Sequence, residues 1–133
     1  MAIDGRRLFG PLFERSSQAA FVMDPVDDRI IEANAAGCAL LGYEREEILK
    51  LMVSDIHPAE MPQLRSFLDV ALRDGRATTV KFTCRTKSGY FLPTEIAIHL
   101  VESAGRRYIL GLVQDRSEHR FREGTAPPPQ RAE

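Results

Sequence analysis

Side chains that commonly bind metals or act as nucleophiles are few in this chain of 133 residues. The three histidines, His57, His99 and His119, do not have the spacing of a metal site. The two cysteines, Cys38 and Cys84, lie in apolar runs and join the histidines in no recognisable ligand set. Two thiols alone make no disulfide framework. We therefore predict no metal site and interpret both cysteines as small core residues.

Enzyme motifs give no stronger signal. The sequence has no Gly-rich phosphate loop, nucleophile elbow or catalytic pair of carboxylates. Ser16, Ser17 and His119 are of catalytic types, but no neighbouring residue would activate them. His119 also lacks the surroundings of a phosphoacceptor, so a solvated helix is the better interpretation. We predict no catalytic residue; the enzyme alternative would be tested by turnover or an autophosphorylated band.

Composition indicates one globular domain. The chain is 44% hydrophobic and 28% charged, and its formal net charge is −1. This charge gives no electrostatic reason to expect a nucleic acid or an anionic membrane as partner. No apolar run approaches the roughly 20 residues of a membrane helix, and no signal peptide is recognisable. We expect a cytoplasmic protein.

The stretch from Arg29 to Lys50 organises the predicted fold. Residues 29–33 are rich in β-branched side chains, which is typical of a strand. Asn34 follows at a position suited to a helix N-cap. Gly42 suits the left-handed conformation that often ends a helix. A second, acidic helical run is predicted over residues 44–49.

Periodicity predicts the remaining elements. One helix is predicted before Gly75, which is suited to end it. Its apolar residues recur on one face: Leu64, Phe67, Leu68, Ala71 and Leu72. From residue 77 the period changes to 2, which predicts strands around 80–85 and 94–100. The run 108–113 is apolar on both faces, so we expect cover on both sides of that strand. Three strands joined by short turns predict an antiparallel meander.

The outer side chains of that last strand, Leu110 and Leu112, need a cover other than the helices. An N-terminal apolar cluster could provide it; the cluster comprises Leu8, Phe9, Leu12 and Phe13. It could dock on its own domain or form a dimer contact. After a short charged helix from Asp115 or Ser117 to Glu123, residues 124–133 with three successive prolines are expected to be a disordered tail or linker.

These elements, in this order, resemble a PAS domain. The landmarks are short and individually unspecific, but they follow one another as in the family: Asp24, Asn34, Gly42-Tyr43 with Glu46-Glu47-Ile48-Leu49, Asp55-Ile56-His57-Pro58, Lys87-Ser88-Gly89, Pro93-Thr94-Glu95 and Asp115-Arg116-Ser117-Glu118. The resemblance implies an α+β fold, with a five-stranded antiparallel sheet in the order 2-1-5-4-3 and short helices on one face. It divides the chain into an N-terminal cap segment 1–13, a PAS domain 14–120 and a disordered tail or linker 121–133.

The flavin-binding light-oxygen-voltage subclass of the family is not matched. Val53 stands where the flavin-reactive cysteine would be. Thr94 replaces the usual flavin-binding Asn, and Val113 replaces the usual Gln. We therefore predict no flavin.

The haem-binding subclass is not matched either. Its proximal His lies early on the long helix, where this chain has Leu64. His57 is nearby, but in Asp-Ile-His-Pro we interpret it as a solvated loop residue. We therefore predict no haem and no other cofactor.

A cavity between sheet and helices is the expected ligand site, although the same residues could form a plain packed core. Its predicted lining is Phe21, Met23, Ile31, Asn34, Cys38, Leu41, Met52, Ile56, Leu64, Leu68, Phe82, Cys84, Thr94, Ile96, Ile98, Ile109 and Val113. A ligand there should be small and apolar, and Thr94 and Asn34 would offer the few polar contacts.

The resemblance implies a signalling role with two versions. In the first, the domain senses a ligand for an effector such as a histidine kinase of a two-component system, a cyclase or a transcription regulator. In the second, it only dimerises and relays a signal through a closed core. Both predict a homodimer through Leu8, Phe9, Leu12 and Phe13 packed on Leu110 and Leu112. By the same resemblance, Asp115 is the predicted transmission residue.

Overall fold

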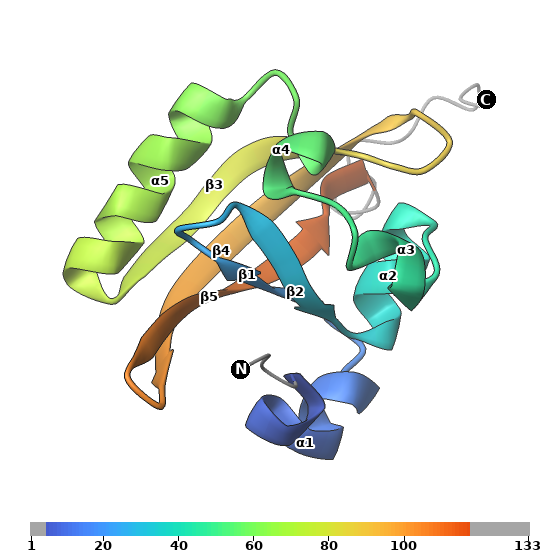
Figure 1. The fold of residues 1–133 in the computed structure, drawn as a ribbon. Coiled ribbons are helices and arrows are strands. Elements are labelled where there is room, and N and C mark those ends of the chain that lie inside the picture. The colour runs from blue at the N-terminus through green and yellow to red at the C-terminus, as the bar shows by residue number, and fades with distance from the viewer. Residues whose placement is uncertain (1–4, 118–133) are drawn as a thin grey trace, which may run out of the picture.

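The computed structural model describes residues 5–117, apart from the side chains of 5–9 and 78–80. Five antiparallel strands form one sheet in the order β2-β1-β5-β4-β3 (Figure 1). The strands are β1 (Ala19–Asp24), β2 (Arg29–Ala33), β3 (Arg76–Arg85), β4 (Phe91–Ser103) and β5 (Arg106–Asp115). The predicted α+β fold and strand order are confirmed.

Within residues 5–117, five helices accompany the sheet. They are α1 (Gly5–Arg15), α2 (Ala35–Leu41), α3 (Arg45–Ile48), α4 (Val53–Ile56) and α5 (Met61–Asp74). The helices α2 to α5 lie between β2 and β3 in the chain and contribute to the main hydrophobic core, which they share with one face of the sheet (Figure 1). That face is called the inner face below.

Local sequence explains where the helices begin and end. Asn34 caps α2, because its side-chain Oδ1 accepts a hydrogen bond from the backbone N–H of Gly37 at 2.8 Å. Gly42 ends α2 in the left-handed conformation, with φ of 85°. Gly75 ends α5 in the same way, with φ of 92°. The apolar stripe of α5 buries Leu64, Phe67 and Ala71 against the core, as its periodicity predicts.

The outer face of the sheet carries a second, smaller core. Phe13 from α1 packs there with Ala20, Val22 and Tyr108, and its neighbours Ile31, Leu110 and Leu112 are half-buried. The chain thus covers part of its own outer face with Phe13. Leu12, by contrast, is 84% exposed. The side chains of Leu8 and Phe9 lie outside the described residues.

Two sequence predictions fall at the C-terminal end. The short charged helix from 115 or 117 to 123 reaches into residues 118–133, which the structure does not describe, and the tail from 121 or 124 onward lies there too.

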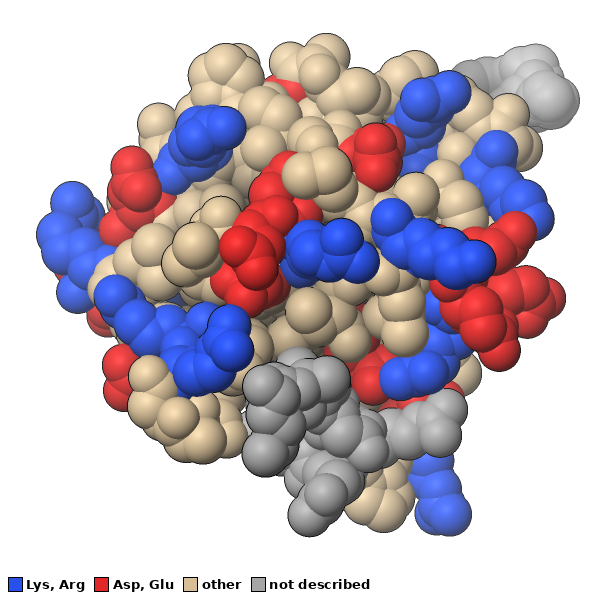
Figure 2. All heavy atoms as spheres, in the orientation of Figure 1, with Lys and Arg blue, Asp and Glu red and all other residues tan. Residues whose placement is uncertain are grey.

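Within residues 5–117, no helix has the length and apolar character needed to cross a bilayer. Figure 2 shows acidic and basic side chains interspersed over the face of the molecule that it displays.

Candidate functional site

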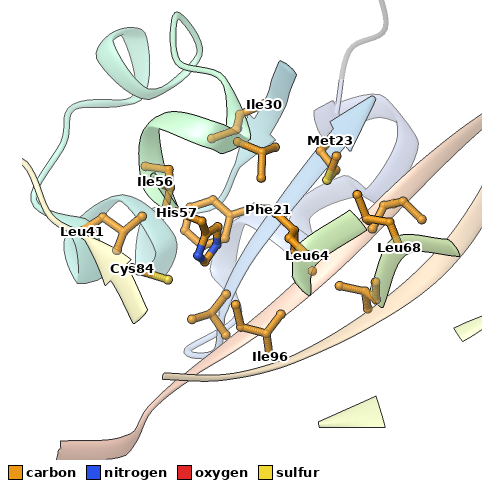
Figure 3. A pocket seen from close by; sticks show the side chains of 15 residues that line it. Phe21, Met23, Ile30, Leu41, Ile56, His57, Leu64, Leu68, Cys84 and Ile96 are labelled. Atoms are coloured by element: carbon orange, nitrogen blue, oxygen red, sulfur yellow. The ribbon is translucent and has the colours of Figure 1, made fainter. Parts of the chain in front are cut away.

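A largely apolar cavity of about 70 Å³ lies between the inner face of the sheet and the helices (Figure 3). Its walls come from β1, β2, β4 and β5, from the end of β3, and from α2, α4 and α5. The lining residues are Phe21, Met23, Ile30, Leu41, Val53, Ile56, His57, Leu64, Leu68, Cys84, Ile96, Ile98, Ile109, Gly111 and Val113. Segments that are far apart in the sequence therefore meet around one small space.

The alternation of the strands explains which side chains reach the cavity. In β4, Ile96 and Ile98 point inward, and in β5 Ile109 and Val113 do the same. The predicted residues that the structure places in the cavity wall are Phe21, Met23, Leu41, Ile56, Leu64, Leu68, Cys84, Ile96, Ile98, Ile109 and Val113.

Three predicted lining residues lie outside the cavity wall. Ile31 packs on the outer face, and its neighbour Ile30 takes the inner position, since successive strand residues point to opposite faces. Met52 precedes α4 and is 42% exposed. Cys38 is half-buried on α2 outside the cavity wall, where burial, with the nearby carboxylate of Glu14, raises the pKa of its thiol.

Asn34 is fully buried, but its amide is used by the backbone and does not line the cavity. Its Oδ1 accepts from the N–H groups of Ala20 at 3.0 Å and Gly37 at 2.8 Å. Its Nδ2 donates to the carbonyls of Phe13 at 3.0 Å and Gln18 at 2.9 Å. Asn34 is thus a structural hub that joins α1, β1 and α2.

Thr94 and Phe82 are also buried outside the cavity wall. The Thr94 hydroxyl donates to the backbone carbonyl of Phe82 at 2.8 Å. The Phe82 ring packs against Phe67, with ring centroids 5.6 Å apart, and against the imidazole of His57. The polar contacts predicted for a ligand at Asn34 and Thr94 are therefore occupied by the protein itself.

Four lining residues were not predicted from the sequence: Ile30, Val53, His57 and Gly111. The interpretation of His57 as a solvated loop residue is wrong, because its side chain is 6% exposed and lies in the cavity wall. The apolar residues Val53 and Ile56 could have indicated that His57 is buried. Both are buried residues of the one-turn helix α4, and His57 directly follows Ile56 at the end of that helix.

His57 is held by the segment between α4 and α5 and by β3. Its Nδ1 lies 2.8 Å from the backbone carbonyl of Thr83 and 3.4 Å from Oε1 of Glu60. The Glu60 carboxylate in turn accepts from the backbone N–H of Thr83. Burial lowers the pKa of His57 below its usual range, against the opposing effect of the Thr83 and Glu60 contacts.

Cys84 is the other lining residue with a reactive group. Burial raises the pKa of its thiol to about 11, although a contact with the Thr94 hydroxyl at 3.5 Å acts in the other direction. The thiol is therefore protonated at neutral pH and is a poor nucleophile. Among the described residues, no three His, Cys, Asp or Glu side chains gather as a metal site.

Asp115 lies at the end of β5, opposite Thr94 in the register of the sheet. Its Oδ1 accepts from the backbone N–H of Ser117 at 2.9 Å and also from the Ser117 hydroxyl. The next residue, Arg116, pairs with Glu95 on β4. The segment that follows β5 is therefore tied to β4 and β5, two of the strands that line the cavity.

Comparison with known proteins agrees with this architecture. The chain is 23% identical over 117 residues to the methyl sulfide methyltransferase-associated sensor of Methanosarcina acetivorans; the match covers 86% of this chain and 12% of that protein. A PAS domain structure from Colwellia psychrerythraea superimposes with a TM-score of 0.72 at 21% identity, covering 84% of this chain and 97% of the other.

A domain of a sensory box sensor histidine kinase/response regulator from Geobacter sulfurreducens gives a TM-score of 0.66 at 24% identity, covering 84% of this chain and 94% of the other. A sequence model of the PAS domain matches residues 18–118. With the strand order and the helices between β2 and β3, this match confirms the predicted resemblance: the chain belongs to the PAS domain family.

Proposed function

We propose that this chain is a PAS sensory module that binds a small, mainly apolar ligand in the cavity and reports its occupancy to an effector. The observation that carries this proposal is the cavity itself, whose lining is almost wholly hydrophobic and is drawn from both the sheet and the helices. A ligand there would touch β4, β5 and α5 at once. The relative from Methanosarcina acetivorans is named a sensor, and the Geobacter domain comes from a sensor histidine kinase/response regulator.

The short distance along the chain between the cavity lining and residues 115–117 supports a role in signal relay. Val113 lines the cavity two residues before Asp115, and Ile96 lines it next to Glu95, the partner of Arg116. A ligand that displaces these strands would alter the contacts of Asp115 and Arg116. We propose that Asp115 transmits the signal to the segment after it.

Dimerisation is part of the same proposal. Leu12 precedes Phe13 in α1 and exposes a large apolar side chain, and Leu110 and Leu112 on the outer face of the sheet are only half-buried. We propose a homodimer in which Leu12, with Leu8 and Phe9, contacts Leu110 and Leu112 of the second copy. The effector would be a kinase, cyclase or transcription regulator, located in the cytoplasm, and any catalytic activity would belong to it.

A second candidate is a relay module with a closed core. The small volume of the cavity favours it, because a well-packed core needs no ligand for stability.

Neither version requires a cofactor. The position of the flavin-reactive cysteine is taken by Val53, and that of the haem ligand by Leu64. Both are apolar lining residues of the cavity, which supports the expectation of no flavin and no haem.

Native mass spectrometry of the freshly purified protein, compared with its denatured mass, tests the two candidates. One adduct per chain that is lost on denaturation supports the sensor, and a dimer without adduct supports the closed core. Ile98→Phe narrows the cavity and is expected to remove the adduct, whereas the control Ala97→Val alters the next residue on β4, outside the cavity lining, and should retain it. A monomer would contradict the dimer.

A further inference from the structure

The cavity wall contains one nitrogen heterocycle among apolar side chains. Figure 3 shows the imidazole of His57 in the ring of residues that line the space. The other polar group of the wall, the Cys84 thiol, already contacts the hydroxyl of Thr94. His57 is therefore the residue that can give the site a directional hydrogen bond.

The contacts of Nδ1 fix the tautomer of this imidazole. Both groups near Nδ1, the carbonyl of Thr83 and the carboxylate of Glu60, are hydrogen-bond acceptors. The hydrogen of a neutral ring must therefore lie on Nδ1, which donates to Thr83. Burial lowers the pKa of His57, so the ring is neutral at physiological pH.

Nε2 consequently carries a lone pair. Within residues 5–117, no donor contacts this atom, which is not sealed off from a water-sized molecule, and the largely buried ring packs edge-on against Phe82 at a centroid distance of 5.5 Å. Nε2 is a separate ring atom that points in another direction than Nδ1. The carbonyl of Thr83, which contacts Nδ1, therefore does not contact Nε2. The wall thus presents a hydrogen-bond acceptor that the protein does not use.

We propose that the cavity selects a small neutral molecule with one hydrogen-bond donor, of the class of short-chain alcohols, whose hydroxyl donates to Nε2 of His57. This inference rests on the proposed function, because it names the ligand class of the same cavity. Size supports the class: an engineered cavity of about 150 Å³ accepts the six carbons of benzene, so 70 Å³ corresponds to about three non-hydrogen atoms.

The same acceptor excludes other small molecules. Ethers and ketones offer only lone pairs, which would face the lone pair of Nε2. Cations and anions would lose their hydration in a mainly hydrophobic space without a charged partner. An aliphatic molecule fits the wall but leaves Nε2 without a donor, which costs affinity.

Ethanol and dimethyl ether test the inference, because they are isomers with the same three non-hydrogen atoms and differ in the donor. Each is titrated into the wild-type protein while the methyl resonances of Ile56, Ile98 and Val113 and the ring nitrogens of His57 are followed by NMR. Ethanol is expected to bind about tenfold more tightly and to shift the Nε2 resonance. Equal affinity for the two isomers, or a spectrum that places the ring hydrogen on Nε2, would overturn the inference but leave an apolar ligand site intact.

His57→Leu removes Nε2 at similar volume, and the control His99→Leu changes a half-buried residue of β4 that does not line the cavity. The first variant is expected to reduce the preference for ethanol to within about twofold, and the second should keep it. If His57→Leu does not fold, the Nε2 shift of the wild-type protein decides the question. Binding of neither isomer, with no native adduct, would overturn both the inference and the sensor proposal.

Discussion

The side-chain amide of Asn34 donates to the backbone carbonyl of Phe13 at 3.0 Å, although the two residues are 21 positions apart. Through this bond the N-cap residue of α2 also holds the end of α1, whose Phe13 covers the outer face of the sheet. One buried side chain therefore links the helix layer on the inner face with the cover of the outer face.

Replacement of Asn34 by Ala is expected to lower the free energy of unfolding by about 3 kcal/mol, measured by urea denaturation. The variant loses the helix cap and the side-chain hydrogen bonds that Asn34 makes with the backbone of Ala20, Gly37 and Phe13. Gln18→Ala is the control, because only the backbone of Gln18 contacts Asn34 and its side chain is exposed. A loss below about 1 kcal/mol for Asn34→Ala would contradict the role of a hub.

Gly37→Ala is expected to destabilise the protein by about 1–3 kcal/mol, although Ala is the better helix former by about 1 kcal/mol. A Cβ at this position would lie 2.9 Å from Cζ of Phe21 and 3.1 Å from the backbone oxygen of Ala20. The double variant Gly37→Ala/Phe21→Leu should recover part of the loss in thermal denaturation, because the clashing ring is gone. A more stable Gly37→Ala variant would show that the contact is not tight.

Leu12 and Phe13 are adjacent but are expected to behave differently. Leu12→Ser should convert the proposed dimer to a monomer in light scattering with little change in stability, because the side chain is exposed within its own chain. Phe13→Ala should lower the free energy of unfolding by about 3 kcal/mol, because it removes a buried ring from the outer core. An unchanged mass for Leu12→Ser would contradict the proposed interface.

Acidification is expected to destabilise the protein through His57. Its pKa in the folded state is lowered, so below the ordinary value of about 6.5 the unfolded chain binds a proton that the folded chain does not. Stability should therefore fall between pH 6.5 and the folded pKa, with a slope of up to about 1.4 kcal/mol per pH unit from this group. His57→Gln should flatten the slope in urea denaturation, whereas the control His99→Gln should follow the wild type.

The sequence by itself determined the local elements and the family. Alternating side chains in β3 and β4, the apolar stripe of α5, and the caps Asn34 and Gly42 each act over a few residues, so their pattern predicts the element directly. The order of these elements then matches only a narrow set of folds, which is why the strand order 2-1-5-4-3 could be predicted from the resemblance.

Only the tertiary structure decided which side chains face the cavity and which polar groups are still available there. The register between β1 and β2 places Ile30 rather than Ile31 inward, and that register depends on pairing across the sheet. The buried amide of Asn34 is used by α1 and β1, whereas Nδ1 of His57 finds its acceptor on β3, 26 residues away. Such long-range contacts leave no periodic signal in the sequence, because they join segments that become neighbours only when the sheet has formed.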